Sequence, residues 1–562
     1  MRKSVFVSCV FACLLALCQD FAHAASASTS RREAAVDRVF AAFAPGMPGC
    51  AVAVYRNGVA EFEKGYGLAN LETLTPIDPH TVFDIGSTSK QFTAAAIVLL
   101  AEDGKLSLDD DVRKYLPEMP DYGSPVTIRQ MLHHTAGLRD YVTLLTFADV
   151  DYDDVSTPAQ ALAMLARQKH LNYRPGESFL YSNSGYFLGS QIVERVSGMS
   201  MREFARQRIF APLGMDHSFY KDDHAEVVAH QASGYAPEEE GRYRISEPNW
   251  EETGDGGVQT SVADLAHWVS NFTTPRIGGA GFVREMERTG TLNDGQSLDY
   301  ALGLIVSAHR GRRMVHHGGS WGGYRAEIVR FPEVGLGVTA LCNSANADAS
   351  TLAIDTADLW LADAPMPAAA STDDAQRAVS PTGKDRGERT VAASAGTYRN
   401  PDSGSLRRVE FQDGLWIEAF GGRYRLASRP AGDFEMVGGP FEARYQFLAG
   451  PGGGLALQQS AMERTTRFTK LALHSPSEAE LQGYAGDYDC EELGTVYRLQ
   501  ANGGELYRIN PLGEREVFRP LQRREFSYGN LTMRFEIGSD GAARHALLDI
   551  GRVRGLDCPR MQ

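Results

Sequence analysis

The sequence predicts an α/β domain built on an antiparallel sheet with a helical insertion, followed by two small all-β antiparallel barrels. Three observations predict this organisation. Strand-like stretches stand at both ends of residues 25–365, with apolar helical stretches between them. From 363 to 390 the composition changes to Ala, Pro, Ser, Thr, Gly and charge, as in a linker. Beyond it, short alternating strands recur with Gly-rich turns, and the pattern occurs twice.

Length and charge narrow the class of protein. A chain of 562 residues exceeds one ordinary domain, and 43% hydrophobic with 23% charged residues is typical of a folded globular protein. The net charge of −15 argues against a polyanionic partner. Because no Lys/Arg-rich run occurs, we expect no nucleic-acid partner.

Residues 1–24 have the pattern of a signal peptide. Arg2 and Lys3 precede an apolar run over 5–17, and Ala22-His23-Ala24 matches a cleavage site. We therefore expect export to the periplasm or the medium. No later segment is long and apolar enough to cross a bilayer, so no membrane span is expected.

Within the domain at 25–365, a helix is expected over 31–43. A hairpin follows, because strand-like residues 50–55 and 61–66 flank Asn57-Gly58, a pair that favours tight hairpin turns. The apolar stretch 91–102 predicts a helix that ends near Gly104. The second group of strands is expected at 301–307, 314–316, 326–330 and 336–341.

The C-terminal part is expected to contain a linker at 366–388 and barrels at 389–473 and 474–562. Ala395-Gly-Thr-Tyr398 opens the first half and Ala485-Gly-Asp-Tyr488 the second, each followed by similarly spaced strands. A module of about 85–90 residues with many short strands has the size of a small closed barrel, which removes exposed sheet edges.

Four cysteines remain after the signal: Cys50, Cys342, Cys490 and Cys558. In an oxidising compartment they allow two disulfides in three connectivities, and four buried free thiols are the alternative. Cys490 and Cys558 stand near the start and end of the second barrel, where closure would bring the outer strands together. Neither a C-x-x-C pair nor a His/Cys cluster occurs, so no metal or other cofactor is expected.

One serine has the setting of a nucleophile. In Ser87-Thr-Ser-Lys90, residues three apart on a helix share a face, so Lys90 points at the Ser87 hydroxyl. A serine hydroxyl needs an adjacent base, and a lysine with a lowered pKa serves. Taken alone, Ser87 could equally be a helix N-cap. A second S-x-x-K match, at Ser218 and Lys221, precedes a polar stretch and is treated as a chance match.

Seven segments, in order, resemble the class C β-lactamase-like serine hydrolases, which are penicillin-recognising enzymes. They are GYGLANLET (65–73), TVFDIGSTSK (81–90), IRQMLHHTAGL (128–138), YSNSGY (181–186), PLGM (212–215), GGVQTSVADL (256–265) and HGGSWGGY (317–324). The resemblance covers about 25–360 and implies a β-lactamase/DD-peptidase-like fold. It also implies that Cys50 pairs with Cys342, because the family's sheet joins strands from both chain ends. Closure of the second barrel favours pairing of Cys490 with Cys558.

The resemblance also assigns roles to residues. Ser87 is the nucleophile, and Lys90 and Tyr181 form the base, with the division between them left open. The substrate-binding positions are Asn183, His317, Gly319 and Ser320. Backbone N–H groups of Ser87 and Ser320 would form the oxyanion hole. His317 stands where many relatives carry lysine, which weakens the case for binding a substrate carboxylate and for β-lactamase activity.

The expected function follows from architecture. A catalytic domain followed by two barrels resembles the bacterial D-aminopeptidases of this family, whose last barrel sends a loop into the cleft. We therefore expect an exported hydrolase that releases N-terminal D-amino acids from small peptides or amides. Two alternatives stay open: an esterase, DD-carboxypeptidase or weak β-lactamase, and a non-catalytic penicillin- or cell-wall-binding protein. The turn at 513–516 is a candidate for the cleft loop, with an ordinary solvated turn as the alternative. The oligomeric state is not indicated.

Overall fold

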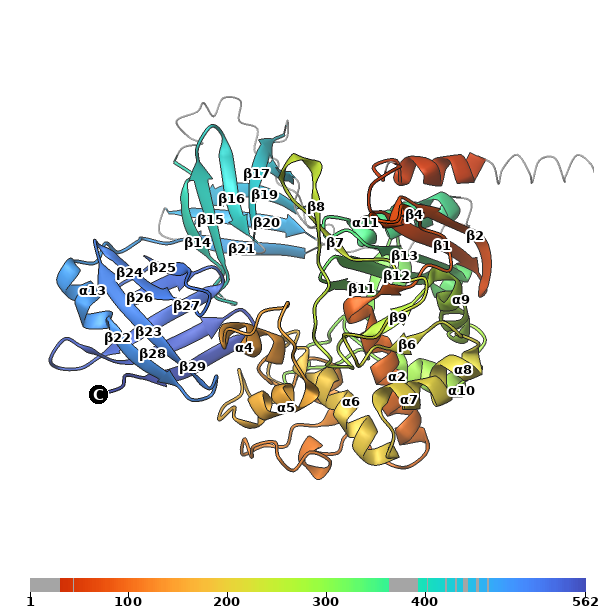
Figure 1. The fold of residues 1–562 in the computed structure, drawn as a ribbon, viewed down its shortest axis with the longest axis horizontal. Helices are drawn as coiled ribbons and strands as arrows, with labels where there is room; N and C mark the ends of the chain where they lie inside the picture. Colours follow the sequence, from red (N-terminus) through yellow and green to blue (C-terminus); the bar gives the residue numbers. More distant parts are fainter. Residues whose placement is uncertain are drawn as a thin grey trace, which may run out of the picture.

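A computed structural model describes residues 31–43, 45–362, 393–401, 403–419, 422–429, 432–437, 443–450, 454–461 and 464–562. Figure 1 shows three distinct parts: the domain that ends at residue 362, called the catalytic-type domain below, and two barrels. The expected signal peptide (1–24) and linker (366–388) lie outside the described residues. Among the helices that are described, none combines the length and apolar character needed to span a bilayer.

The first domain is built on a six-stranded antiparallel sheet in the order β10-β11-β12-β13-β1-β2. The hairpin strands lie at one edge, and β1 pairs with β13 along its whole length, so both ends of the domain meet in one sheet. The strands are β1 (Cys50–Arg56), β2 (Val59–Tyr66), β10 (Ile305–His309), β11 (Arg312–Trp321), β12 (Tyr324–Phe331) and β13 (Leu336–Cys342). The predicted antiparallel sheet drawn from both ends is confirmed.

Local sequence accounts for where these strands begin. Asn57 and Gly58 have φ of 49° and 80°, the left-handed conformations that a two-residue hairpin turn requires. The strand expected at 301–307 begins only at Ile305. Gly303 interrupts it with φ of 68°, where the chain passes so close to α2 that a Cβ would lie 2.7 Å from the Gln91 nitrogen.

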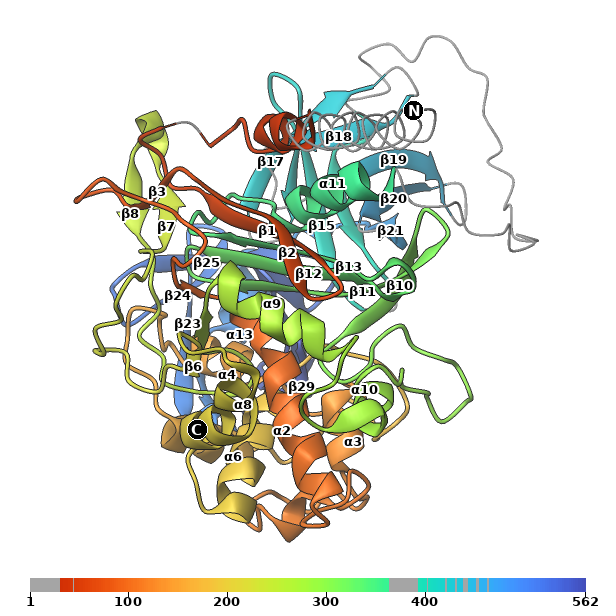
Figure 2. The ribbon, with the colours of Figure 1, turned by 90° about the vertical axis from the view of Figure 1, so that its right-hand side faces the viewer.

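Helices pack on both faces of the sheet, as the turned view in Figure 2 shows. One face carries residues 31–39 and α11, whose core includes Val36, Phe40 and Trp360. The other face carries α2 and the inserted helices, and this core is larger. The helices are α2 (Lys90–Glu102), α3 (Ile128–Leu132), α4 (Tyr141–Phe147), α5 (Pro158–Ala166), α6 (Ser184–Ser197), α7 (Met201–Ala205), α8 (Ala211–Leu213), α9 (Val262–Asn271), α10 (Gly279–Met286) and α11 (Ala349–Leu361).

The insertion also contains short strands and turns of tighter or wider helix. The strands are β3 (Leu68–Asn70), β4 (Thr75–Pro76), β5 (Phe83–Asp84), β6 (Phe219–Tyr220), β7 (Tyr235–Pro237), β8 (Tyr243–Ile245) and β9 (Val258–Thr260). β9 lies between β5 and β6 in a small sheet beneath the start of α2. The helical turns are η1 (Gly86–Ser89), η2 (Val112–Lys114), η3 (Arg206–Phe210) and η4 (Glu239–Gly241); a further turn, η5 (Pro332–Val334), connects β12 to β13 outside the insertion.

The first C-terminal module is a closed eight-stranded antiparallel barrel, because its first strand pairs with its last. Its core is separate from that of the rest of the molecule. The strands are β14 (Gly396–Arg399), β15 (Leu406–Phe411), β16 (Leu415–Ala419), β17 (Gly422–Ser428), β18 (Phe434–Val437), β19 (Ala443–Ala449), β20 (Leu455–Ala461) and β21 (Arg464–Lys470).

The second module repeats this plan after α13 (Glu478–Tyr484). Its eight strands form an antiparallel meander, and a bridge between Tyr488 and Arg560 joins its outer strands. The strands are β22 (Gly486–Cys490), β23 (Thr495–Asn502), β24 (Glu505–Ile509), β25 (Arg515–Pro520), β26 (Glu525–Tyr528), β27 (Leu531–Ile537), β28 (Ala543–Ile550) and β29 (Val553–Pro559). The expectation of two successive barrel-like modules is thus confirmed.

The sequence repeat has a structural counterpart. Tyr398 and Tyr488 are both fully buried, and each hydroxyl donates to the carbonyl four residues earlier, at 2.7 Å and 2.6 Å. The glycines before them, Gly396 and Gly486, have φ of 146° and 148°. Each repeat therefore opens with the same tyrosine-anchored strand.

Both predicted disulfides are present. Cys50 and Cys342 face each other across the β1–β13 ladder and are bonded, and Cys490 and Cys558 join the first and last strands of the second barrel. The predicted pairing is confirmed. The first bond ties the two ends of the catalytic-type sheet, and the second holds the barrel closed.

Candidate active site

The candidate nucleophile lies at the turn between β5 and α2. The Asp84 carboxylate accepts hydrogen bonds from the Gly86 N–H and from Gln259, both at 2.7 Å, and so fixes the turn that carries Ser87. Gly86 has φ of 49°, and a Cβ there would lie 2.7 Å from the Ser320 nitrogen. Glycine therefore lets β11 pass directly beside the turn.

Lys90, the first residue of α2, is fully buried beside Ser87. Its ammonium donates to the Ser87 hydroxyl at 3.0 Å, to the Asn183 side-chain oxygen at 2.9 Å and to the Asp255 carbonyl at 2.7 Å. These contacts use all three donors of a lysine ammonium. The spacing of three residues thus produces the serine–lysine contact that the sequence predicts.

Tyr181 and Asn183 come from the segment that leads into α6. The Tyr181 ring centre lies 5.0 Å from the Lys90 nitrogen, and its ring packs 4.2 Å from that of His134. The Asn183 backbone N–H donates to Asp140 at 2.6 Å, which holds its amide against Lys90. Ser87, Lys90, Tyr181 and Asn183 therefore lie in one cluster.

Strand β11 runs beside the turn that carries Ser87 and contains three of the expected substrate-binding residues, His317, Gly319 and Ser320. A Cβ at Gly319 would lie 1.9 Å from the Ile85 carbonyl oxygen, and the Thr88 hydroxyl donates to the His317 carbonyl at 3.3 Å. Because the strand and the turn are in direct contact, the Ser320 N–H reaches the neighbourhood of Ser87.

His317 is a neutral side chain. Burial, and next the Lys90 charge, lower its pKa to about 3. Its Nδ1 lies 2.6 Å from the Gly318 carbonyl, which can only accept, so Nδ1 carries the proton and Nε2 accepts from the Tyr300 hydroxyl at 2.9 Å. The strand therefore supplies no cation at this position.

Nearby carboxylates are also perturbed. Burial raises the pKa of Asp84 to about 6, and burial opposed by Lys90 raises that of Asp255 to about 6. Asp255 accepts from the buried Tyr141 hydroxyl at 3.0 Å. Burial, followed by the Lys90 charge, also holds the pKa of His134 well below its ordinary value. These shifts mark a buried, polar region around the Lys90 ammonium.

The alternative serine is not part of this cluster. The Ser218 hydroxyl is buried and lies 2.8 Å from Asp264 and 2.7 Å from Thr260. Asp264 also receives the His217 N–H at 2.9 Å, so these contacts fix the segment around β6. Ser218 thus makes structural contacts only.

The second barrel packs against the insertion next to the site. Arg139 is buried in a contact of 2.8 Å with Glu492, and its guanidinium also donates to the Arg554 and Gly555 carbonyls. Tyr497 donates to the Phe147 carbonyl at 2.9 Å. Figure 1 shows β29 beside α4. The C-terminal module therefore forms part of the surroundings of the site.

The turn at 513–516 is not the loop that reaches the site. Asn510 and Glu514 hydrogen-bond to each other through backbone and side chains, and Glu516 pairs with Arg508, which in turn pairs with Asp149. The alternative of an ordinary turn is the one observed. The connection between β28 and β29 approaches Tyr181 instead, through Arg552.

Sequence reasoning missed several residues of the site. Asp140 and Tyr300 act on Asn183 and His317 from other segments, and Asp255 contributes a backbone carbonyl, which no side-chain motif reveals. Arg552 lies far along the chain in another module. Arg139 and Asp140 directly follow the matched segment at 128–138, and this position was the sequence signal that could have identified them.

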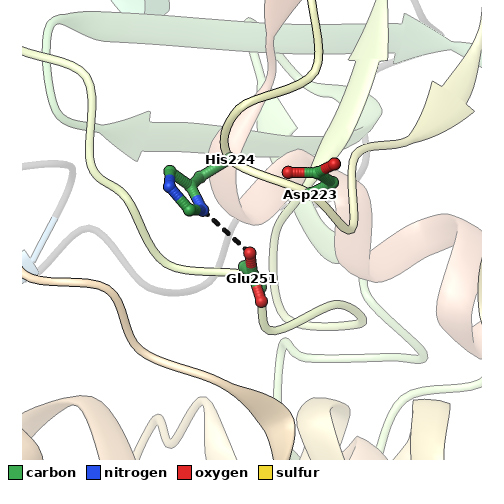
Figure 3. Close-up of side chains that lie close together, drawn as sticks. All are labelled: Asp223, His224 and Glu251. Carbon is green, nitrogen blue, oxygen red and sulfur yellow. Dashed lines mark hydrogen bonds and ion pairs between the residues drawn. The ribbon is translucent and has the colours of Figure 1, made fainter.

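One side-chain cluster among the described residues has the composition of a metal site (Figure 3). Asp223, His224 and Glu251 bring ligand atoms within 4.8 Å of one another, and the histidine Nδ1 lies 2.8 Å from the Glu251 carboxylate. These residues could hold a divalent cation. They take no part in the Lys90 contacts, and Asp223 is exposed.

Fold and site together define a class: an α/β domain with a serine and a buried lysine at the start of one helix. The Beta-lactamase family model matches residues 36–360, more than half of the chain. The chain belongs to the Beta-lactamase family.

The similar proteins include hydrolases. A D-aminopeptidase of Gluconobacter oxydans is 28% identical over 489 residues, covering 85% of this chain and 86% of the relative. A penicillin-binding protein of Bacillus subtilis is 32% identical over 292 residues, covering 48% of this chain and 62% of the relative. The chain thus spans less than two thirds of that protein, and 56% of a D-aminopeptidase of Brucella anthropi.

Solved structures share the fold. The octameric penicillin-binding protein homologue from Pyrococcus abyssi superposes with a TM-score of 0.55 at 27% identity, covering 78% of this chain and 99% of its own. These relatives support a hydrolase of this family.

Proposed function

We propose that this chain is an exported serine hydrolase that cleaves amide bonds through an acyl-enzyme on Ser87 and releases N-terminal D-amino acids from small peptides or amides. The observation that carries the chemistry is the contact of 3.0 Å between the Ser87 hydroxyl and the buried Lys90 nitrogen. The D-aminopeptidase relative, whose match covers 85% of the chain and so extends beyond the first domain, supports the substrate class.

In acylation, the Ser87 oxygen attacks the substrate carbonyl and its proton passes to the Lys90–Tyr181 pair. Backbone N–H groups of Ser87 and Ser320 would stabilise the oxyanion. The same pair returns the proton to the leaving nitrogen, the C–N bond breaks, and the free amine departs. Water then attacks the ester in the same manner and releases the acid, which regenerates the Ser87 hydroxyl.

The alternatives share the same domain. An esterase, DD-carboxypeptidase or weak β-lactamase would use the same acyl-enzyme with another substrate. A non-catalytic penicillin- or cell-wall-binding protein is disfavoured, because the Lys90 ammonium contacts the Ser87 hydroxyl and is held there by Asn183 and the Asp255 carbonyl. The neutral His317 disfavours the β-lactamase, since a substrate carboxylate would find no cation at position 317 of β11.

Labelling tests the nucleophile. A fluorescent penicillin or phosphonate is expected to label the wild type and not Ser87→Ala. Ser218→Ala is the matched control, because among the described residues its hydroxyl contacts Asp264 and Thr260 rather than the Lys90 cluster, and it is expected to label normally. Labelling that persists without the Ser87 hydroxyl would refute the assignment. Hydrolysis of D- and L-alanyl anilides, simple esters and a cephalosporin by the same variants then separates the substrate classes.

Export is supported by the signal-like residues 1–24 and by two disulfides, which persist in oxidising compartments. Amino-terminal sequencing of protein recovered from the periplasm or medium tests it. A chain that begins at Ala25 is the expected result; protein found only in the cytoplasm with residue 1 intact would argue against export.

A further inference from the structure

The connection between β28 and β29 brings a guanidinium from the second barrel to the candidate active site. The Arg552 carbonyl accepts hydrogen bonds from the Asp140 N–H at 3.4 Å and from the Asn172 side chain at 2.9 Å. Its guanidinium carbon lies 4.8 Å from the centre of the Tyr181 ring. The Lys90 nitrogen lies 5.0 Å from the same ring, so two cations flank one tyrosine.

The Arg552 guanidinium has unused binding capacity. Its side chain is 42% exposed, and its ionic contact in the described structure is Nη1 to Asp140 Oδ2 at 3.8 Å, longer than a hydrogen bond. That Asp140 oxygen already receives the Asn183 N–H at 2.6 Å, and the other oxygen receives Thr143. A guanidinium has five donors in a fork that matches a carboxylate. An incoming carboxylate therefore meets donors that no described residue occupies at hydrogen-bonding distance.

The position of Tyr181 fixes which part of a substrate comes near Arg552. Under the proposed mechanism, the Lys90–Tyr181 pair returns the proton to the leaving nitrogen. Whichever of the two gives it, that nitrogen must approach within hydrogen-bonding distance of the pair. The guanidinium stacked on Tyr181 consequently faces the leaving group and not the acyl group held on Ser87.

Position 317 of β11, on the other side of the site, offers no competing cation. His317 is neutral, pinned between the Gly318 carbonyl and the Tyr300 hydroxyl. Lys90 is buried, with its three donors committed. Of the described cations that reach this cluster, Arg552 is the partly exposed one.

We propose that Arg552 binds the carboxylate of the leaving amino acid, so that the preferred substrates are short peptides with a free carboxyl terminus one residue beyond the cleaved bond. This inference rests on the proposed acyl-enzyme function of Ser87. The positive charge that β11 lacks at position 317 is supplied from the second barrel, 235 residues further along the chain.

The test compares substrates that share an acyl group and differ in one charge: D-alanyl-D-alanine and its C-terminal carboxamide. The wild type is expected to favour the free acid in kcat/KM by roughly 10- to 100-fold, the range of a charge-assisted pair. Arg552→Gln should remove this preference while changing the carboxamide rate less than about threefold. Arg552→Lys should keep part of it, because the charge remains and the fork is lost. Arg544→Gln, at the far end of β28, is the charge-matched control and should behave as wild type.

A second pair, 3-carboxyphenyl and 3-carbamoylphenyl acetate, places the same charge difference on an ester leaving group. It measures the preference even if peptides are not cleaved. Equal rates within a pair for the wild type, or equal losses on both members in Arg552→Gln, would overturn the role of Arg552. Hydrolysis that survives Ser87→Ala would instead overturn the proposed function, as would the absence of turnover on all four compounds. Phosphonate labelling of Ser87 in each Arg552 variant reports that the site is still folded.

Discussion

At the scale of residues, Lys90 contacts more groups of the candidate site than its spacing to Ser87 alone predicts. Its three hydrogen bonds reach the side chain just before α6, a backbone carbonyl before β9 and the candidate nucleophile one turn away. Three donors committed to three acceptors fix the nitrogen within the site, which is what a proton carrier requires. When the nitrogen is neutral, its lone pair takes the place of one donor and can accept the Ser87 proton.

This arrangement predicts that the base acts as a unit. Tyr181→Phe and Lys90→Ala are each expected to lower kcat by roughly two to four orders of magnitude, with smaller effects on KM. Steady-state kinetics on a small ester measures both. Tyr186→Phe is the control, because that nearby hydroxyl donates to the Leu132 carbonyl, and its kcat should stay within about threefold of wild type. Near-normal turnover in Tyr181→Phe would remove Tyr181 from the mechanism.

The buried carboxyl of Glu252 should make the free energy of unfolding depend on pH. It is 6% exposed, one oxygen accepts from Ser156 at 2.5 Å, and the other has no hydrogen-bond partner among the described residues. Burial raises its pKa from 4.5 to about 7. The folded state therefore holds this proton more tightly than the unfolded state, and the carboxyl reduces stability progressively from about pH 4.5 to 7 and fully above pH 7.

Glu252→Gln removes that charge while keeping an acceptor for Ser156. Its gain in the free energy of unfolding over wild type should be larger at pH 8 than at pH 4.5, by on the order of 2–3 kcal/mol. Urea denaturation at the two pH values measures the difference. Glu72→Gln, on an exposed turn, controls for the loss of one negative charge. A gain that is the same at both pH values would contradict the prediction.

At the scale of elements, the attachment of β22 and β29 to the insertion positions the hairpin that carries Arg552. Arg139 and Glu492 form a buried pair, and Arg139 also donates to the carbonyls of two residues on β29. Asn172 holds the same strand, accepting from the Arg554 N–H at 2.8 Å. The hairpin is therefore anchored by polar contacts just beyond its tip.

Glu492→Gln is expected to lower the free energy of unfolding by about 3–5 kcal/mol, because it leaves the Arg139 charge buried without its partner. Amide hydrogen exchange of residues 551–555 should rise in the same variant. The neighbouring Glu491→Gln is the matched control: it removes an exposed pair with Lys169, whose loss should cost less than about 1 kcal/mol. Similar stability losses in both variants would show that the buried pair has no special role.

The sequence predicted most elements of the first sheet, because a β-hairpin, an apolar helix and period-two strands carry local signals. Gly303 shows the limit: strand was expected through it, but its packing against α2 delays the start of the strand to Ile305. In the site, Ser87 and Lys90 were predictable from a spacing of three. Arg552 was not, because its role depends on where a whole barrel docks, and no pattern around Gly551 records that contact.

At the scale of the molecule, the two barrels differ in how they join the rest. The second barrel shares one continuous hydrophobic core with the insertion, whereas the first has a core of its own. The first is tied to the second by ion pairs, among them Arg399 with Glu525 at 2.8 Å and Arg519 with Glu418 at 3.1 Å. The second barrel is thus the one built into the catalytic-type domain.

The disulfide that closes the second barrel should affect both the stability of this barrel and the substrate preference of the site. Replacing Cys490 and Cys558 together with alanine removes a cross-link between residues 68 apart and should lower the stability of this module by about 2–5 kcal/mol. Thermal unfolding followed by far-ultraviolet circular dichroism measures this loss of stability. Because Arg552 precedes Cys558 on the same hairpin, the carboxylate preference should weaken with it. An unchanged midpoint would indicate that the β22–β29 contacts suffice alone.

The pairing of β1 with β13 also has a consequence in time. One edge of β1 finds β2 as soon as the hairpin emerges from the ribosome, but its other edge waits for a strand whose cysteine lies 292 residues later. At a synthesis rate of about 5–20 residues per second, this wait is roughly 15–60 s. Throughout it, an apolar strand edge has no native neighbour and can pair with another nascent chain. A ribosome that stalls between β2 and β13 would therefore leave an aggregation-prone fragment, and chaperone occupancy should peak in that interval of translation.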